Sequence, residues 1–486
     1  VFWDNNNITI DGTVDLTDST NQKTRFEASG WEVIEIDGHD PKEIDSAISA
    51  AKKSEKPTMI ACKTHIAIGT AAQDTSKGHG ALTDPELIKN AREVYQWSHK
   101  PFDIPKSIKE QWEQAGLEGH KAFKRWQSKL ENLSNSKRKE FERIFSGDAP
   151  KKLTSAIRKF KKESSAASPT IATRKSSELT LNAINSFMQE TIGGSADLTG
   201  SNNTKSNDMK IFDKNNRKGR YIHYGIREHA MAAAMNGMAL HGGIRPYGGT
   251  FMCFTDYARP AMRLAALMKI PTIFVMTHDS IGLGEDGPTH QPVEHLAISR
   301  STPNTLVFRP ADTIETAECW EIALSMKNTP SVLALSRQNL PTVRQKHQFA
   351  NLVSKGAYIL EEASKNRRVI LIATGSEVSI ALKARELLED KGIGTRVVSM
   401  PCMELFSQQD ETYKRRILPA GQAIRIGIEA GVRTGWDEWL LGNRARANKS
   451  SFVGMKSFGA SAPAEVLFNH FGITPDRIAS EATNLL

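Results

Sequence analysis

The chain has 486 residues, 39% of them hydrophobic and 24% charged, and this length predicts about two to four domains with their own cores. No run of about 18 apolar residues occurs, which argues against a membrane-spanning helix. The cysteines lack the paired spacing of a disulfide framework or a zinc site, which favours a reducing, cytoplasmic location; they are Cys62, Cys253, Cys319 and Cys402.

The net charge of +9 is compatible with nucleic acid or with anionic small substrates. Much of the excess lies in residues 137–162, a Lys/Arg-rich region that also holds Glu140 and Glu142. Neither interleaved aromatic residues nor an RNA-binding motif accompanies this region. We therefore expect a solvated helical region and no nucleic-acid partner.

The first part of the chain predicts helices that alternate with short apolar strands. Residues 1–3 are typical of the end of a buried strand, and because a domain does not naturally start in mid-strand, we expect a segment to precede them. A helix near 18–30, a strand at 32–36, a helix capped by Asp40 and a strand at 58–64 follow. This alternation predicts a parallel sheet with right-handed crossovers.

The middle of the chain predicts a helical region followed by a second α/β domain. Residues 84–157 are rich in helix formers, and we expect Trp97, Trp112 and Trp126 to anchor them. Residues 164–169 are small and are typical of a linker, so the domain boundary is expected there or slightly before.

Three loops of this second domain are expected at the carboxyl ends of strands, where parallel sheets carry their chemistry. A Gly/Ser-rich loop is by itself weak evidence for phosphate binding, because turns use the same residues. The loops cover residues 193–201 after a short strand, 278–292 after a buried strand at 268–277, and 336–339 after a strand at 331–335.

The last part of the chain predicts a third α/β domain. Strands are expected at residues 368–374, 395–399 and 423–429, with a helix that begins near Gly375 and Ser376. The start of this helix could hold an anion.

Three runs between residues 221 and 295 are typical of a site rather than of a core. They are IHYGIREH at 222–229, GTFMCFTDYAR at 249–259 and THDSIGLGEDGPTHQP at 277–292. Together they resemble the pyrimidine-binding domain of the transketolases, which use thiamine diphosphate. The resemblance extends over essentially all 486 residues.

Spacing alone leaves other interpretations of these runs open. Glu228 could form an ion pair with Arg227 or Arg259, and the three aromatic residues could belong to a core stripe. The two histidines and the aspartate of the third run could bind a metal, although their spacing lacks a common ligand pattern.

The resemblance implies three consecutive α/β domains with mainly parallel sheets, the first of them incomplete. Residues 1–150 would form the remainder of the diphosphate-binding domain and a helical linker, residues 151–345 the pyrimidine-binding domain, and residues 346–486 the C-terminal transketolase domain. Members of the family are homodimers in which the cofactor lies between the first domain of one subunit and the second domain of the other.

The resemblance also implies residue roles. Glu228 would hydrogen-bond a pyrimidine nitrogen of thiamine diphosphate and so favour loss of the C2 proton; His79 and His278 are the other candidate catalytic residues. Asn6 and the carbonyl of Ile8 would bind Mg²⁺, or Ca²⁺ or Mn²⁺ in its place. The remaining candidates are Asp197, Phe251, Phe254 and Tyr257 for the cofactor, and Arg174, Ser201, Asp286, His290 and Arg337, together with His79 and His278, for the sugar phosphate.

The implied reaction is the reversible transfer of a two-carbon ketol group from a ketose phosphate, such as xylulose 5-phosphate, to an aldose phosphate, such as ribose 5-phosphate. It belongs to the pentose phosphate pathway and the Calvin cycle. The alternatives are dihydroxyacetone synthase, deoxyxylulose-phosphate synthase and a non-catalytic transketolase-like subunit. The family's Gly-Asp-Gly half of the metal site lies upstream of residue 1, so we expect the chain alone to bind the cofactor weakly and to be inactive.

Overall fold

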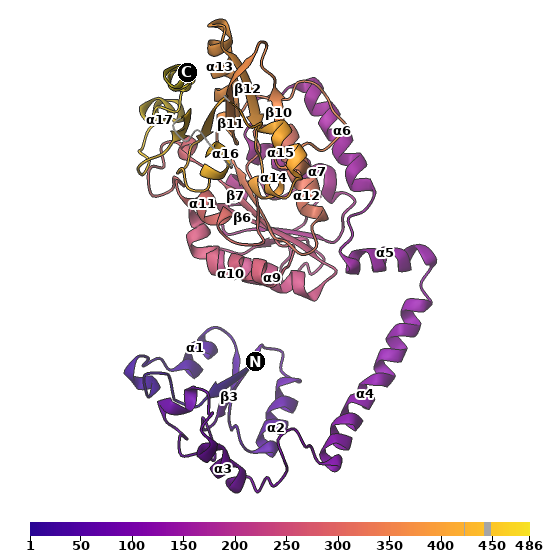
Figure 1. Ribbon diagram of the computed structural model, residues 1–486. Helices are drawn as coiled ribbons and strands as arrows, with labels where there is room; N and C mark the ends of the chain where they lie inside the picture. The colour runs from indigo at the N-terminus through magenta and orange to yellow at the C-terminus, as the bar shows by residue number, and fades with distance from the viewer. Residues whose placement is uncertain (422, 442–448) are drawn as a thin grey trace. The chain divides into compact units, whose positions relative to one another are not determined.

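The computed structural model describes residues 1–421, 423–441 and 449–486, which form two compact units, Val1–Leu130 and Glu131–Leu486 (Figure 1). The first unit contains a three-stranded parallel sheet in the order β1-β3-β2. No helix in the described residues is both long and apolar enough to cross a membrane. The elements of this unit are β1 (Phe2–Asn5), α1 (Gln22–Ala28), β2 (Glu32–Asp37), α2 (Pro41–Ala51), β3 (Thr58–Lys63), η2 (Ser76–His79), α3 (Pro85–Val94) and α4 (Lys106–Glu131).

Two expectations for the first unit are wrong. The strand at the start of the chain exists, but it lies at the sheet edge beside β3 alone, and 57% of Phe2 is exposed. The three tryptophans do not anchor the helices, because α4 buries no residue and 77% of Trp112 is exposed. Trp97 and Trp126 are also exposed, at 36% and 49%.

The second unit opens with helices and then forms a six-stranded, fully parallel sheet in the order β5-β4-β6-β7-β9-β8. Parallel strands joined by helices place all their carboxyl ends at one edge. The elements are α5 (Asn135–Ser146), α6 (Lys152–Ala167), α7 (Thr173–Asn185), β4 (Thr191–Ser195), α8 (Thr199–Asn202), β5 (Tyr221–His223), α9 (Glu228–His241), β6 (Arg245–Phe251), α10 (Thr255–Leu267), β7 (Ile273–Thr277), α11 (His295–Arg300), β8 (Leu306–Phe308), α12 (Thr313–Ser325) and β9 (Ser331–Leu335).

Helices cover both faces of this sheet, which is why β7 and β9 are buried at every position (Figure 1). Ile273 and Val275 of β7 pack with α6, α7 and α12. Phe274 and Met276, which point the other way, pack with α9 and α10. The alternation along one strand therefore fixes which helices lie on each side.

A second sheet in this unit has the order β10-β12-β11-β13-β14, with only its edge strand β10 antiparallel. Helices again cover both of its faces. The elements are β10 (Tyr358–Glu361), β11 (Arg367–Ala373), α13 (Glu377–Asp390), β12 (Gly394–Ser399), α14 (Met403–Ser407), α15 (Glu411–Ile417), β13 (Ile424–Glu429), α16 (Asp437–Leu441), β14 (Ser450–Gly454), α17 (Ala464–His470) and α18 (Pro475–Leu485). The mainly parallel α/β class is thus confirmed.

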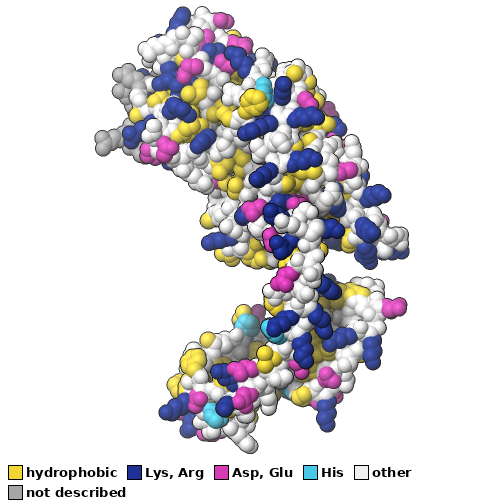
Figure 2. Space-filling view, turned by 90° about the vertical axis from the view of Figure 1, so that its right-hand side faces the viewer, with side chains coloured by type: hydrophobic (Ala, Val, Ile, Leu, Met, Phe, Trp, Pro, Cys, Tyr) yellow, Lys and Arg dark blue, Asp and Glu magenta, His cyan; other side chains and the backbone are white. Residues whose placement is uncertain are grey.

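The expected linker at residues 164–169 is wrong, because α6 continues to Ala167 and Ser164 is buried. Ser and Ala are small enough for close helix packing, and α6 packs against α7 and α12. On the face shown in Figure 2, Lys and Arg side chains of the second unit are spread out with acidic side chains between them.

Candidate functional site

The candidate residues of the second unit follow strands of the same parallel sheet. Asp197 comes shortly after β4, Glu228 follows β5, and Phe251 is the last residue of β6. His278 comes directly after β7, and Arg337 lies two residues beyond β9. The fold therefore brings five separate stretches of sequence to one sheet edge.

Glu228 is the first residue of α9 and is only 8% exposed. Among the described residues its carboxylate has neither an ion-pair nor a hydrogen-bond partner, so Arg227 and Arg259 do not neutralise it. Burial raises the pKa of the Cys253 thiol to about 12, and the nearby carboxylates of Asp256 and Glu228 add to this increase. Glu228 thus lies close to the aromatic run as a buried, unpaired acid.

Aromatic and imidazole rings form a continuous cluster beside this acid. The rings of Phe251 and Phe254 are parallel to within 8° at a centroid distance of 5.7 Å. The ring of His278 lies 3.8 Å from that of Phe251, and the ring of His290 lies 5.6 Å from that of Phe254. Tyr257 contacts Phe254 at the edge of this cluster and is 63% exposed.

A chain of hydrogen bonds fixes the ring of His278. The Ser195 hydroxyl donates to Asn202 Oδ1, and Asn202 Nδ2 donates to Thr277 Oγ1 at 2.7 Å. The Thr277 hydroxyl, which accepts from Asn202, has its own proton free for His278 Nδ1 at 2.8 Å. When Thr277 donates to Nδ1, a neutral ring carries its proton on Nε2, where it can be donated to a ligand.

Positive charge gathers around this imidazole. Burial, together with the charges of Arg174, Arg337 and His290, lowers the pKa of His278 to about 3. Burial and the charge of Arg337 also lower the pKa of Arg174, whose Nη1 donates to the carbonyl of Ser201 at 2.7 Å. Two arginines and two histidines therefore share one small region, as a polyanionic ligand requires.

Asp197 and Asp286 are both exposed, which leaves their carboxylates open to a ligand. Asp197 has a φ of 62° and His278 a φ of 61°, in the left-handed region that non-glycine residues seldom adopt. Such backbone costs about 1–3 kcal/mol per residue and clusters at functional sites.

In the first unit, Asn6 and Ile8 form a tight turn, because Asn6 Oδ1 accepts a hydrogen bond from the amide of Ile8 at 3.0 Å. His79 ends the 3-10 helix η2 and is exposed. The Nδ1 atom of His65 lies within hydrogen-bond distance of the Asp74 carboxylate, at 2.8 Å on the same loop. No group of three His, Cys, Asp or Glu side chains suited to a metal ion occurs in the part of the chain that the structure describes.

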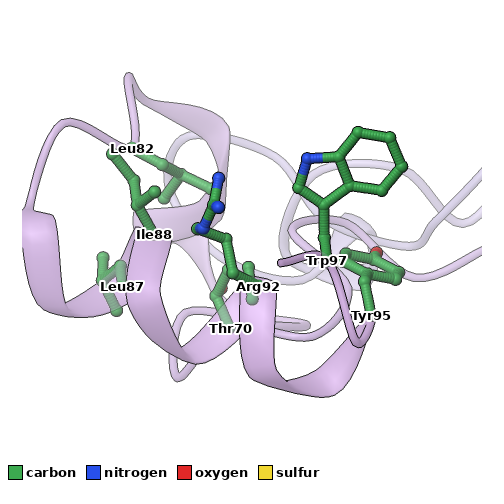
Figure 3. Close-up of a pocket in the computed structure, with 8 residues that line it drawn as sticks. Thr70, Leu82, Leu87, Ile88, Arg92, Tyr95 and Trp97 are labelled. Atoms are coloured by element: carbon green, nitrogen blue, oxygen red, sulfur yellow. The ribbon is translucent and has the colours of Figure 1, made fainter. Parts of the chain in front are cut away.

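An apolar pocket of about 510 Å³ lies in the first unit between α3 and the preceding loop (Figure 3). None of the candidate residues is among its lining residues, which are Thr70, Leu82, Leu87, Ile88, Ala91, Arg92, Tyr95 and Trp97.

Comparison with known proteins assigns the family. Three family models match: "Transketolase, thiamine diphosphate binding domain" at residues 1–150, "Transketolase, pyrimidine binding domain" at 169–343 and "Transketolase-like TK C-terminal domain" at 356–474. A transketolase of Rhodobacter capsulatus is 61% identical over 487 residues, which cover 100% of this chain and 72% of the relative. The chain belongs to the transketolase family.

Other transketolases agree with this assignment. The transketolase of Sinorhizobium medicae is 51% identical over 490 residues, which cover 100% of this chain and 69% of that relative. The solved transketolase of Leishmania mexicana superimposes with a TM-score of 0.90 at 37% identity, and that of Pichia stipitis in complex with sedoheptulose 7-phosphate with 0.91 at 37% identity. Each alignment covers 100% of this chain and 71% of the solved one. The protein is a transketolase-type enzyme with thiamine-diphosphate-binding domains.

The sequence did not predict the residues that support the candidate site on the side facing the protein interior. Asp279 was read only as part of a motif, yet its Oδ2 accepts a hydrogen bond from Arg309 Nε at 2.8 Å, and both residues are buried. Gln291 was likewise unassigned, although its Nε2 donates to two backbone carbonyls. The sequence did offer a signal for these two residues, because an acid and an amide side chain lie inside an unusual motif.

The ring of His278 should stay neutral from pH 8 down to pH 5. Its folded-state pKa of about 3 lies below the ordinary 6.5, so between these values the unfolded chain binds the extra proton. Stability should therefore fall as the pH drops below 6.5, by up to about 1.4 kcal/mol per pH unit from this group. NMR of the ring, assigned with a His278→Gln variant, measures this, and a titration midpoint near 6.5 would contradict it.

Proposed function

We propose that the buried acid Glu228 and the cluster of rings and cations beside it are the catalytic site of a sugar-phosphate ketol transfer. The reaction moves a two-carbon ketol unit between ketose and aldose phosphates, as in the pentose phosphate pathway. The observation that carries the proposal is a buried carboxylate without a protein partner, next to parallel aromatic faces. The four buried, free cysteines are compatible with a cytoplasmic location.

The residues present fit the pyrimidine half of thiamine diphosphate. The carboxylate of Glu228, which has no partner among the described residues, can accept a hydrogen bond that a ligand donates. The faces of Phe251 and Phe254 suit a flat heterocycle. When bound, thiamine diphosphate supplies the electron sink of the reaction, and Glu228 would hold the proton that this activation requires.

The cationic groups are suited to the sugar phosphate. Arg174 and Arg337 offer planar forks that match phosphate oxygens, and Ser201 lies beside Arg174. We assign His278 Nε2 and His290 to sugar oxygens, together with the exposed Asp286. A neutral His278 can donate to a hydroxyl or carbonyl oxygen without bringing a further positive charge.

We assign the diphosphate and its metal to the first unit, with Asp197 as a supporting residue near the cofactor. Asn6 and the carbonyl of Ile8 would be oxygen ligands of Mg²⁺, an ion that prefers such ligands. In this role Asn6 Oδ1 would exchange its contact with the Ile8 amide for the metal. His79 would contact both diphosphate and substrate.

We infer that the chain has three domains, at residues 1–150, 151–345 and 346–486. We also infer that the protein forms a homodimer. Large apolar side chains are exposed on the segment before α9 and on α10: Ile226 at 79%, Tyr257 at 63% and Leu267 at 67%. Such a surface is typical of a protein interface. A second subunit that covers this surface would also exclude water from the aromatic cluster on the side where Tyr257 is exposed.

Glu228→Gln should lower kcat by at least about 100-fold, because the amide keeps the shape of the side chain but cannot hold the transferable proton. KM for the sugar phosphates should change little, since Arg174 and Arg337 are untouched. Steady-state kinetics with saturating thiamine diphosphate and Mg²⁺, together with NMR of proton exchange at the cofactor C2, measure both effects. Glu163→Gln, on the exposed face of α6, is the matched control. A variant with normal exchange at C2 would refute the role of Glu228.

Mixing two inactive variants tests whether one site combines two subunits. If His79 of one subunit serves the site that contains Glu228 of the other, a His79→Ala and Glu228→Ala heterodimer has one intact site. After subunit exchange, the mixture should regain about a quarter of the wild-type activity. Exchange is verified by co-purification of differently tagged subunits. An inactive mixture that contains heterodimers would contradict the shared site.

A further inference from the structure

We propose that residues 459–462, in the region matched by the C-terminal domain model, are positioning residues for the sugar-binding loop at residues 278–292. The C-terminal region otherwise contributes no residue to the candidate site. We call residues 459–462 the brace. This inference rests on the proposed roles of Asp286 and His290 in sugar binding. It gives the C-terminal region a structural role in positioning the sugar-binding loop.

The brace is bonded to the loop on both sides of Asp286. The Nε2 group of Gln291, next to His290, donates to the carbonyl of Ala460 at 2.8 Å and to that of Gly284, within the loop, also at 2.8 Å. One amide group thus closes the loop on itself and ties it to the brace. The Ser461 hydroxyl donates to the carbonyl of Glu285 at 2.5 Å.

Packing makes this attachment specific. Gln291 is 3% exposed, and a Cβ atom at Gly459 would lie 1.6 Å from its Oε1, so only glycine leaves room for the amide. At Gly287 a Cβ atom would lie 3.4 Å from the Cβ of Ser461. The 3-10 helix η4 (Ile281–Leu283) of the loop also packs against α17, which follows the brace.

The other end of the loop is fixed independently. Asp279, next to His278, is bonded to the fully buried Arg309, whose Nη1 group contacts Glu377 at the start of α13 and the carbonyl of Thr374 at 3.0 Å. With this end held by Arg309, the brace is what ties the stretch around Asp286 to the C-terminal region. A loosened brace should therefore let Asp286 and His290 leave the geometry that a sugar needs.

Two variants weaken the brace from its own side, far in sequence from the loop. Gly459→Ala should displace the Gln291 amide, and Ser461→Ala removes the bond to Glu285. We expect amide hydrogen exchange of residues 280–292 to accelerate by about tenfold in Gly459→Ala and less in Ser461→Ala. KM for a ketose phosphate should rise about five- to tenfold with kcat within about twofold, because binding and not chemistry is weakened.

Ser457→Ala is the matched control, since within residues 1–421, 423–441 and 449–486 the Ser457 hydroxyl bonds only to the carbonyl of the neighbouring Phe458. The proposal would be overturned if amide hydrogen exchange of residues 280–292 were no faster in Gly459→Ala than in Ser457→Ala. Faster exchange with an unchanged KM would also overturn it, because the brace would then hold the loop without positioning the site. His290→Ala with an unchanged KM would instead refute the proposed function, while hydrogen exchange would still report on the brace.

Discussion

Convergence of buried parallel strands at one sheet edge is the constraint on which the candidate site depends. The strands must be parallel because helices cover both faces of the sheet, and helical crossovers return each strand in the same direction. Their carboxyl ends then deliver an acid, aromatic rings, imidazoles and guanidinium groups from separate parts of the chain. Nothing local in the sequence brings Glu228 to Cys253, or Arg174 to Arg337 and His278; the sheet does.

Behind this edge, a buried ionic network connects the site to the C-terminal sheet. Arg309 is fully buried and is satisfied by Asp279, Thr374 and Glu377. A buried charge of this kind is tolerated only when its hydrogen bonds are complete, and removal of one partner costs about 3–5 kcal/mol. Arg309 also fills the space beside Gly375, so this helix start, which the sequence left open for an anion, is already occupied by a cation.

The sequence predicted what depends on local patterns. The strand before Ser336 and the cap at Asp40 both agree with the structure. Features that depend on tertiary packing were not predictable in this way. The segment 164–169 appeared to be a linker but is mostly helix, because its small residues let helices approach closely. The exposure of Tyr257 likewise depends on which neighbours cover it, and no periodicity encodes that.

The central claim is that this sheet edge binds the phosphate of a sugar, and Arg337→Ala tests it most directly, because Arg337 is exposed and not needed for the core. The measurement is kcat/KM for a phosphorylated and an unphosphorylated ketose donor, with the exposed Arg415→Ala as control. The account predicts a loss of about 10- to 100-fold for the phosphorylated donor alone, the value of a charged hydrogen bond. An equal loss for both donors, or none, would contradict it.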